Sequence, residues 1–216
     1  MRKVILLALF GVGLVSYVQS QTIISKTIGT SGKNAEMKFD FADDIHIEAW
    51  NKNTIELEVS VNLEDNKYND YYSLNIDEEG DRIQLVEKVD FESIKKELGV
   101  KKLCNFETTI NYKLKVPTDL AFDLKTISGE IELIGVQGEM NINSVSGFID
   151  YSIPLSHKVH IDLSTVTGDV YSNVKFNNTA PKEFSWVGTK RELSLNEGTV
   201  PVEFKTVSGD IFLRKL

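Results

Sequence analysis

The stretch TVSGDIFL, Thr206–Leu213, decides the fold because the chain contains three further versions of it. These are TISGEIEL from Thr126, SVSGFIDY from Ser144 and TVTGDVYS from Thr165. Self-similar phrases of this length are the sequence signature of a repeat architecture, in which each copy builds one structural unit. The first question is therefore what one phrase does to the backbone.

The spacing of the phrases is nearly regular. Their glycines are 18, 21 and 41 residues apart in the order Gly129, Gly147, Gly168 and Gly209. The last interval is about twice the others, and Gly188 lies 20 residues after Gly168 and 21 before Gly209. We therefore expect a decayed fifth copy at Gly188. A period of about 20 residues is typical of stacked repeat proteins.

Within each phrase the apolar residues change sides at the glycine. Phe122 and Leu124 share one parity before Gly129, and Ile131 and Leu133 have the other parity after it. A straight strand cannot do this, because a shift of one residue turns every side chain to the opposite face. A bend can, and glycine adopts the positive φ angles that bends often need. Each phrase is thus predicted to be a strand, a bend and a second strand facing one interior.

The residues at the bends are small. Serine and threonine hydroxyls beside a tight corner can hydrogen-bond the local backbone. The predicted structural corners are Ser128, Gly129, Ser146, Gly147, Thr167, Gly168, Gly188, Ser208 and Gly209. Stacked corners of this kind predict an all-β chain folded as a single-chain β-helix, or β-solenoid. The alternative is a β-sandwich whose hairpins resemble one another.

The chain before residue 122 follows a different pattern. Residues 26–121 alternate as opening strands, with a polar insertion near 64–103. That insertion contains one helix-like stretch, DFESIKKELG, which Asp90 can cap and Gly99 can end. We expect the opening strands to cap one end of the stack and the charged tail at Arg214 to protect the other. Residues 122–216 form the repeats, so residues 21–216 are expected to be one domain and a monomer.

Residues 1–20 read as a secretory signal peptide. Arg2 and Lys3 precede the apolar run VILLALFGVGLVSYV, and VQSQ offers a cleavage site before Gln21. The rival interpretation is an uncleaved membrane anchor, but the run is shorter than the roughly 20 residues of a spanning helix. Removing the two basic residues changes the formal charge from −8 to −10.

Composition limits the partners. The chain is 41% hydrophobic and 26% charged, as in globular proteins. No run of Lys and Arg is evident, which argues against nucleic acid and against an anionic membrane surface, so membrane contact is expected only through the signal peptide. The one cysteine, Cys104, cannot form an internal disulfide and is expected to be a small buried apolar residue.

The four repeated phrases, with the upstream stretches FADDIHIEAWNKNTIELEVSV and YKLKVPTDLAFDLKT, resemble the bacterial β-strand-repeat putative adhesin family. The resemblance covers about Thr27–Leu216. It implies a β-helix, described as right-handed, and a place in the bacterial envelope. No catalytic residues are implied. The stretch NNTAPKEFSWVGTKRELSLNEG departs from the pattern, which predicts an irregular rung over 173–200.

Few residues of the chain are candidates for a catalytic or ligand-binding role. The outward acids Glu130, Asp169 and Asp210 could form a ligand stripe for Ca²⁺ or sugar, interrupted by Phe148. The alternative is that they are ordinary solvated charges, since charged side chains generally lie on the surface. His157 and His160 are not accompanied in the sequence by a full set of four zinc ligands. Trp50 and Trp186 could stack on sugars or cover an edge of the core. No catalytic, metal or cofactor site is predicted.

We therefore expect a secreted, non-enzymatic envelope protein, periplasmic or on the bacterial cell surface. It would be structural or adhesin-like and would present an acidic wall to an envelope or surface partner, with a glycan among the candidates. The alternative is a carbohydrate-active enzyme, a polysaccharide lyase or hydrolase on the same scaffold. A deep polar groove across several rungs would favour the enzyme.

Overall fold

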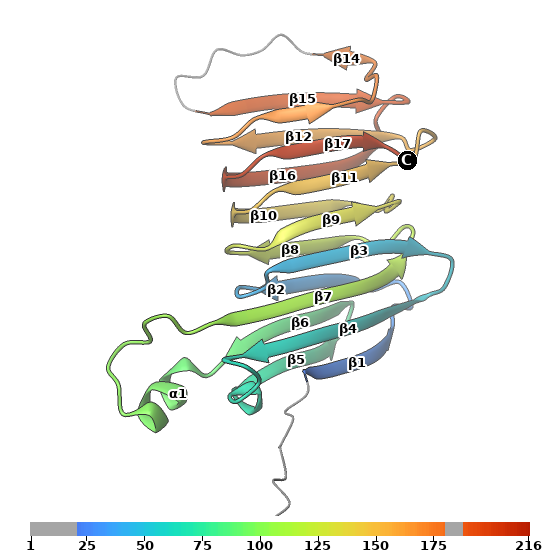
Figure 1. Ribbon diagram of the computed structural model, residues 1–216. Coiled ribbons are helices and arrows are strands. Elements are labelled where there is room, and N and C mark those ends of the chain that lie inside the picture. Colours follow the sequence, from blue (N-terminus) through green and yellow to red (C-terminus); the bar gives the residue numbers. More distant parts are fainter. Residues whose placement is uncertain (1–20, 180–187) are drawn as a thin grey trace, which may run out of the picture.

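Two β-sheets face each other across one hydrophobic core in the computed structural model, which describes residues 21–179 and 188–216 (Figure 1). Sheet A contains, in spatial order, β1 (Thr22–Gly29), β4 (Thr54–Leu63), β7 (Thr108–Pro117), β3 (Asp44–Trp50), β9 (Glu130–Ile134), β11 (Ile149–Ile153), β17 (Ile211–Lys215) and β13 (Val170–Ser172). Sheet B contains β14 (Asn178–Thr179), β15 (Thr189–Leu195), β12 (Val159–Thr165), β16 (Val200–Ser208), β10 (Met140–Ser146), β8 (Phe122–Thr126), β2 (Asn34–Phe39), β6 (Arg82–Val89) and β5 (Tyr72–Glu79).

The repeated phrases each run from sheet B into sheet A. β8 leads to β9, β10 to β11, β12 to β13 and β16 to β17, and we call each such pair a winding. Neighbouring windings pair in parallel in both sheets. The pairs β2–β3 and β6–β7 join the same parallel stack. The corners of the windings lie along one side of the molecule, the left in Figure 1.

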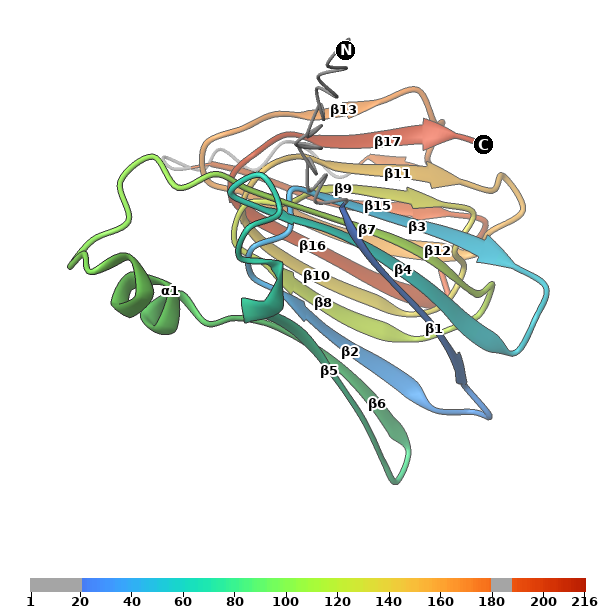
Figure 2. The same ribbon diagram turned by 60° about the horizontal axis from the view of Figure 1, so that its bottom comes forward.

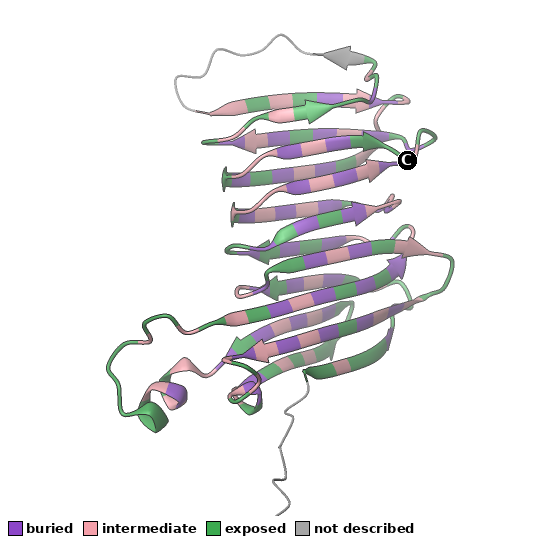
Figure 3. Cartoon of the chain, viewed as in Figure 1, coloured by how far each residue is buried: buried purple, intermediate pink, exposed green. Residues whose placement is uncertain are grey.

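Side-chain alternation explains why these residues form strands. Along β8 the residues Phe122, Leu124 and Thr126 are buried, and Asp123 and Lys125 between them are exposed. The same alternation runs through the other central strands (Figure 3). The inward residues of both sheets form one core, in which the rings of Phe39 and Tyr112 stack with centroids 3.9 Å apart. Burial of these rows is the main stabilising contribution.

The windings do not stack in the order of the sequence. The winding of the last phrase, β16–β17, lies between β10–β11 and β12–β13. β15 pairs antiparallel with the outer side of β12, and β16 then pairs parallel with its inner side. An interval of 41 residues between Gly168 and Gly209 therefore reflects a detour to the outside of the sheet and back.

Antiparallel strands flank the parallel stack at both ends of sheet B and at one end of sheet A, whose other edge is the parallel strand β13. β1 and β4 follow β7 at one end of sheet A, and β5 follows β6 in sheet B. β15 and β14 cover β12 at the other end of sheet B. The opening strands thus do lie at one end, whereas the tail at Arg214 belongs to β17, which is an internal strand. Strand edges protected in this way resist pairing with other chains.

The all-β class is confirmed, and the fold consists of two sheets that face each other. The windings do not form a closed solenoid, so the sandwich alternative also describes the two layers. The handedness of the coil, the single domain and the monomer stay predictions. Residues 1–20, with the predicted signal peptide, and residues 180–187, with Trp186, lie outside the described residues.

The predicted helix is confirmed as α1 (Phe91–Leu98), inserted between β6 and β7. The side chain of Asp90 accepts a hydrogen bond from the Ser93 amide, and Gly99 ends the helix in the left-handed conformation at φ 66°. A short 3₁₀ helix, η1 (Asn69–Tyr71), connects β4 and β5. Over the residues that the structure describes, no helix combines the length and the apolar character that crossing a membrane requires.

Candidate functional site

The four predicted corner glycines lie in a single file, in the spatial order Gly129, Gly147, Gly209 and Gly168. A Cβ atom added to Gly147 would lie 2.5 Å from the carbonyl oxygen of Gly129. One added to Gly209 would lie 1.9 Å from that of Gly147, and one added to Gly168 would lie 2.2 Å from that of Gly209. The file is therefore too tight for a side chain at Gly147, Gly209 and Gly168, whereas a Cβ atom added to Gly129 would come no closer than 3.1 Å to a neighbour.

The reason why these corners need glycine differs from the expected one. Of the four, only Gly147 has a positive φ, at 89°. At Gly168 and Gly209 the requirement comes from the carbonyl group of the next winding, which occupies the space of the Cβ atom. Close approach between backbones, more than a left-handed conformation, selects glycine here.

The corner hydroxyls bind backbone. Ser146 Oγ donates to the carbonyl of Ile127 at 3.2 Å, and Thr167 Oγ1 donates to that of Val207 at 3.1 Å. Each bond joins two stacked corners. Ser128 and Ser208 occupy the same positions in their windings and are exposed. Ser146 and Thr167 thus connect neighbouring corners of the stack, and their hydroxyls are directed at protein.

Gly188 does not turn the chain from sheet B into sheet A. It has φ 82° and lies against the backbone of Thr165 and Val166, and β15 then runs through sheet B. The fifth corner that the spacing predicted is therefore the entrance to an antiparallel edge strand. In its described residues the rung over 173–200 therefore departs from the pattern of the other windings.

The predicted ligand stripe is split into two pairs. Glu130 lies beside Asp44 at the start of sheet A, and Asp210 lies beside Asp169. Phe148 separates Glu130 from Asp210. One carboxylate oxygen of Asp210 accepts a hydrogen bond from the Asp169 amide at 2.8 Å. At least one acid of the stripe therefore supports the local backbone.

A broad groove of ≈ 990 Å³ lies on the outer face of sheet A. It crosses β1, β4, β7, β3, β9 and the start of β11. Its lining carries seven carboxylates, those of Asp44, Glu48, Glu56, Glu58, Glu130, Glu132 and Asp150. The groove therefore extends over strands from both halves of the chain.

The groove is strongly acidic. Against its seven carboxylates stand the three lysines Lys26, Lys113 and Lys115, so the net charge is −4 with His46 neutral. His46 Nδ1 and Glu132 Oε2 are 2.7 Å apart and form an ion pair when the imidazole is protonated. Two further carboxylates of the lining pair with cations outside it, Asp150 with Arg214 at 2.6 Å and Glu56 with Lys52 at 3.5 Å. A concave surface with an excess of one sign of charge attracts ligands of the opposite sign.

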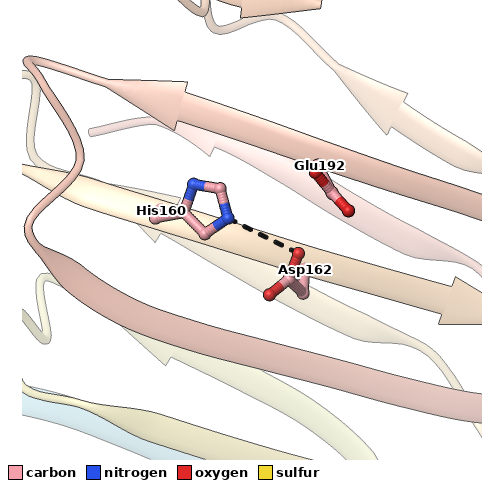
Figure 4. Close-up of side chains that lie close together, drawn as sticks. All are labelled: His160, Asp162 and Glu192. Carbon is pink, nitrogen blue, oxygen red and sulfur yellow. Dashed lines mark ion pairs between the residues drawn. The ribbon is translucent and has the colours of Figure 1, made fainter. Parts of the chain in front are cut away.

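The opposite face carries a small cluster of metal-ligating types on sheet B (Figure 4). His160 and Asp162 come from β12 and Glu192 from β15, and their ligand atoms lie within 4.8 Å of one another. His160 Nε2 is 3.6 Å from Asp162 Oδ1, and Nδ1 is 2.9 Å from Ser194 Oγ. These three side chains could hold a divalent cation. Both carboxylates are exposed, as solvated charges usually are.

Sequence reasoning missed this cluster because Glu192 is 30 residues from Asp162 and reaches it only through the antiparallel register of β12 and β15. It also missed an apolar ridge on the corner side. The residue between the two hydroxyls of each phrase is β-branched, apolar and 41–49% exposed: Ile127, Val145, Val166 and Val207. The regular Thr/Ser-Ile/Val-Ser/Thr pattern was the available signal.

Three other candidates have structural roles. His157 is buried, and burial lowers the pKa of its imidazole. Trp50 Nε1 donates to the carbonyl of Thr54, and Lys52 Nζ lies 4.2 Å from the centre of the indole ring. The ammonium group thus covers a ring face that a sugar would need. Cys104 was expected to be buried but is exposed, because it lies in the loop after α1 rather than in a strand.

Comparisons agree with the fold. The chain is similar to the crystal structure of a putative cell adhesion protein from Clostridium sporogenes, at 9% identity over 91% of this chain and 100% of that chain, with a TM-score of 0.55. Putative adhesins from Bacteroides fragilis (10% identity, 92% and 99% coverage) and Parabacteroides merdae (13%, 89% and 96%) have TM-scores of 0.31 and 0.25, too low to carry an argument. No curated protein matches the chain.

A likeness at 9% identity concerns the fold alone. The family assignment has a separate basis, since the family model described as Toastrack DUF4097 matches residues 27–214. The match includes all four repeated phrases and the opening strands, and it confirms the resemblance drawn from them. The chain belongs to the Toastrack DUF4097 family.

Proposed function

We propose that this protein is a secreted, non-enzymatic envelope protein of adhesin type, built as a two-sided β-solenoid. Its sheet A would present the acidic groove to a cationic segment of an envelope or surface partner. The observation that carries the proposal is the groove itself, with seven carboxylates against three lysines. The predicted signal peptide and the cell-adhesion name of the Clostridium structure support the envelope location.

The strand register makes the groove a rigid surface. Glu58, Lys113, His46, Glu132 and Asp150 follow one another across neighbouring strands of sheet A. Neighbouring strands are about 4.8 Å apart, so the charges stand at fixed intervals on a paired backbone. A surface that is organised before binding loses little conformational entropy when a partner docks. This favours a recognition role over a structural one.

A basic peptide tests the proposal. A fluorescent peptide rich in Lys and Arg and free of acids should bind the purified protein, and the affinity should fall as salt increases. The triple variant Glu48→Gln, Glu58→Gln and Glu130→Gln should bind about tenfold more weakly, since each exposed pair contributes up to about 1 kcal/mol.

The matched control removes three acids from the outer face of sheet B. Asp77→Asn, Asp123→Asn and Glu192→Gln change the net charge equally but lie outside the groove. Affinity in this control should stay close to that of the unmodified protein. Equal weakening of the two triple variants would show that net charge alone drives binding, and the groove would lose its role.

The second candidate function is the carbohydrate-active enzyme, and the polar groove across several strands favours it. Carboxylates on facing strands are the groups that glycoside cleavage uses. A panel of acidic and neutral polysaccharides should show no new reducing ends or unsaturated products with the protein. Product formation that Glu132→Gln abolishes would replace the binding function by a catalytic one.

A further inference from the structure

The corner between β6 and β7 differs from those of the repeated phrases. The corners of the repeated phrases contain three residues after the buried hydroxyl. The corner between β6 and β7 contains α1 and the loop that follows it, up to the start of β7. The excursion protrudes from the corner side of the molecule (Figures 1 and 2). We call residues 91–106 the protrusion. A protruding segment can reach a partner that the flat sheets cannot.

The protrusion is basic in an acidic protein. It has four lysines, Lys95, Lys96, Lys101 and Lys102, against two glutamates, Glu92 and Glu97, so its net charge is +2, whereas that of the whole chain is −8. One acid flanks it on each side, Asp90 and Glu107, so the whole connection between β6 and β7 has a net charge of zero.

The glutamates of the protrusion are engaged. Glu92 pairs with Lys95 at 2.6 Å, and Glu97 accepts a hydrogen bond from the hydroxyl of Tyr71. Within the described part of the chain, Lys96, Lys101 and Lys102 form no ion pair. In the sequence the lysines form two separate pairs, and the fold brings Lys95 of the first pair together with Lys101 and Lys102 around one hollow.

Apolar side chains accompany the lysines. Leu98 and Val100 are 44% and 43% exposed at the end of α1. Lys95, Lys101 and Lys102 also border a hollow of ≈ 530 Å³ whose apolar lining is formed by Phe91, Leu103 and Phe106. Ammonium groups around an apolar floor, next to exposed aliphatic side chains, suit an amphiphilic anion.

The base of the protrusion is firmly packed. The ring of Phe91 meets that of Phe41 edge-on at 5.0 Å, and Phe106 lies 6.2 Å from Phe91 and 5.7 Å from Tyr68. Ile94 is completely buried. The lysines and aliphatic side chains therefore project from an ordered support, so that their arrangement is a property of the fold.

We propose that the protrusion is a contact surface for an anionic lipid bilayer. Lysines Lys96, Lys101 and Lys102 would lie among the headgroup phosphates, and Leu98 and Val100 would enter the interface. Each lysine near an anionic membrane contributes about 1 kcal/mol, which corresponds to about a fivefold change in partitioning. Exposed aliphatic residues are what distinguish a bilayer from a nucleic acid as partner, because phosphate backbones offer them no apolar environment.

Vesicle co-sedimentation tests the contact with the full chain. Vesicles of phosphatidylglycerol and phosphatidylcholine at about 30:70 should bind the protein, and vesicles of phosphatidylcholine alone should bind it much less. Lys96→Gln, Lys101→Gln and Lys102→Gln together should weaken partitioning by about a hundredfold. Leu98→Ser with Val100→Ser should weaken the part of the binding that survives high salt.

The matched control is Lys125→Gln, Lys158→Gln and Lys190→Gln, three exposed lysines elsewhere that change the net charge equally. It should bind like the unmodified protein, and circular dichroism should show all variants folded. Because every variant has the same N-terminus, differences arise from the substituted residues.

Four outcomes would overturn the proposal. Three of them are no preference for anionic vesicles, equal binding of the two lysine variants, and complete competition by millimolar inorganic phosphate, which would make the hollow a site for a free anion. The fourth is binding of duplex DNA without vesicle binding.

Discussion

The repeated half of the molecule and the opening half build the same two-sheet core with different corners. In the repeated half, three residues separate Thr126 from Glu130, and the glycines of successive corners touch. In the opening half, four residues separate Phe39 from Asp44, which are the partners of that pair in the next winding. Between β6 and β7 the corner expands to hold α1. The core tolerates this variation because only the inward rows must stay in register.

One inward column shows what the corners have in common. Thr126, Ser144, Thr206 and Thr165 are buried at the last inward position of sheet B and lie side by side in the strand register. Thr126 Oγ1 accepts a hydrogen bond from the amide of Gly129 at 3.2 Å. At this position the turning backbone directs polar groups inward, and a buried polar group needs a partner.

In the opening half, Phe39 and then Glu87 continue the same column, since Lys38 is paired with Val86 one residue earlier. Glu87 is 5% exposed, and its Oε2 accepts a hydrogen bond from the Phe41 amide at 2.8 Å. In the opening half a buried carboxylate thus hydrogen-bonds the backbone of the turn, as buried hydroxyls do in the repeated half. A buried carboxylate loses far more hydration than a hydroxyl, so the opening half should be sensitive to pH and the repeated half to side-chain volume.

The largest effect is expected in the glycine file. Gly209→Ala places a Cβ atom 1.9 Å from the Gly147 carbonyl oxygen, so the backbone of two windings must move apart. We expect a loss of about 3 kcal/mol in the free energy of unfolding, measured by urea denaturation. Gly80→Ala is the control, because Gly80 has φ 60° but open space around it. Its cost should be about 1 kcal/mol. Equal losses in both variants would contradict steric contact as the reason for glycine.

The second effect concerns Glu87. Burial raises the pKa of this carboxyl to about 7, the amide of Phe41 offsets part of the rise, and the charges of Asp40 and Asp43 add to it. Because the folded state holds the proton more tightly than the unfolded state, the contribution of Glu87 is present below about pH 4.5 and is lost as pH rises through about 7. At pH 8 the loss is about 3 kcal/mol.

Glu87→Gln should remove that loss. The variant should be more stable than the unmodified protein at pH 8 and should lose this advantage at pH 5, as measured by urea denaturation at several pH values. His157 titrates in the opposite sense, since its pKa is lowered, but it is present in both proteins and cancels in the difference. A stability difference that does not vary with pH would rule out Glu87 as the titrating group.

The smallest effect distinguishes two threonines of the column. Thr165 Oγ1 donates to the Gly209 carbonyl at 3.0 Å, whereas Thr206 Oγ1 is buried without a hydrogen-bond partner among the described residues. Thr165→Val should cost about 1 kcal/mol, and Thr206→Val should be neutral or slightly stabilising. Thermal melting of the two variants checks the order. A larger loss at Thr206 would mean that its hydroxyl has a partner, such as a buried water.

Much of the local structure could be predicted. The alternation around Phe122 and Leu124, the parity change at Gly129 and the cap at Asp90 all depend on neighbours in the chain, and each was found as expected. The acidic groove could not be predicted, because Glu58, Glu132 and Asp150 meet only through strand pairing. The grouping of Lys95 with Lys101 and Lys102 around one hollow depends in the same way on the folded path of the chain.

The sequence by itself determined that strands turn at the four Ser/Thr-Gly phrases and keep their apolar sides toward one interior, since side-chain parity and glycine act over a few residues. Only the tertiary structure decided that the last winding enters the stack between two earlier ones. Identical phrases offer nearly identical edges, so local preference does not distinguish neighbours. The detour of β15 along the outer edge of β12 brings β16 to the inner edge, and with it the contacts that make each glycine necessary.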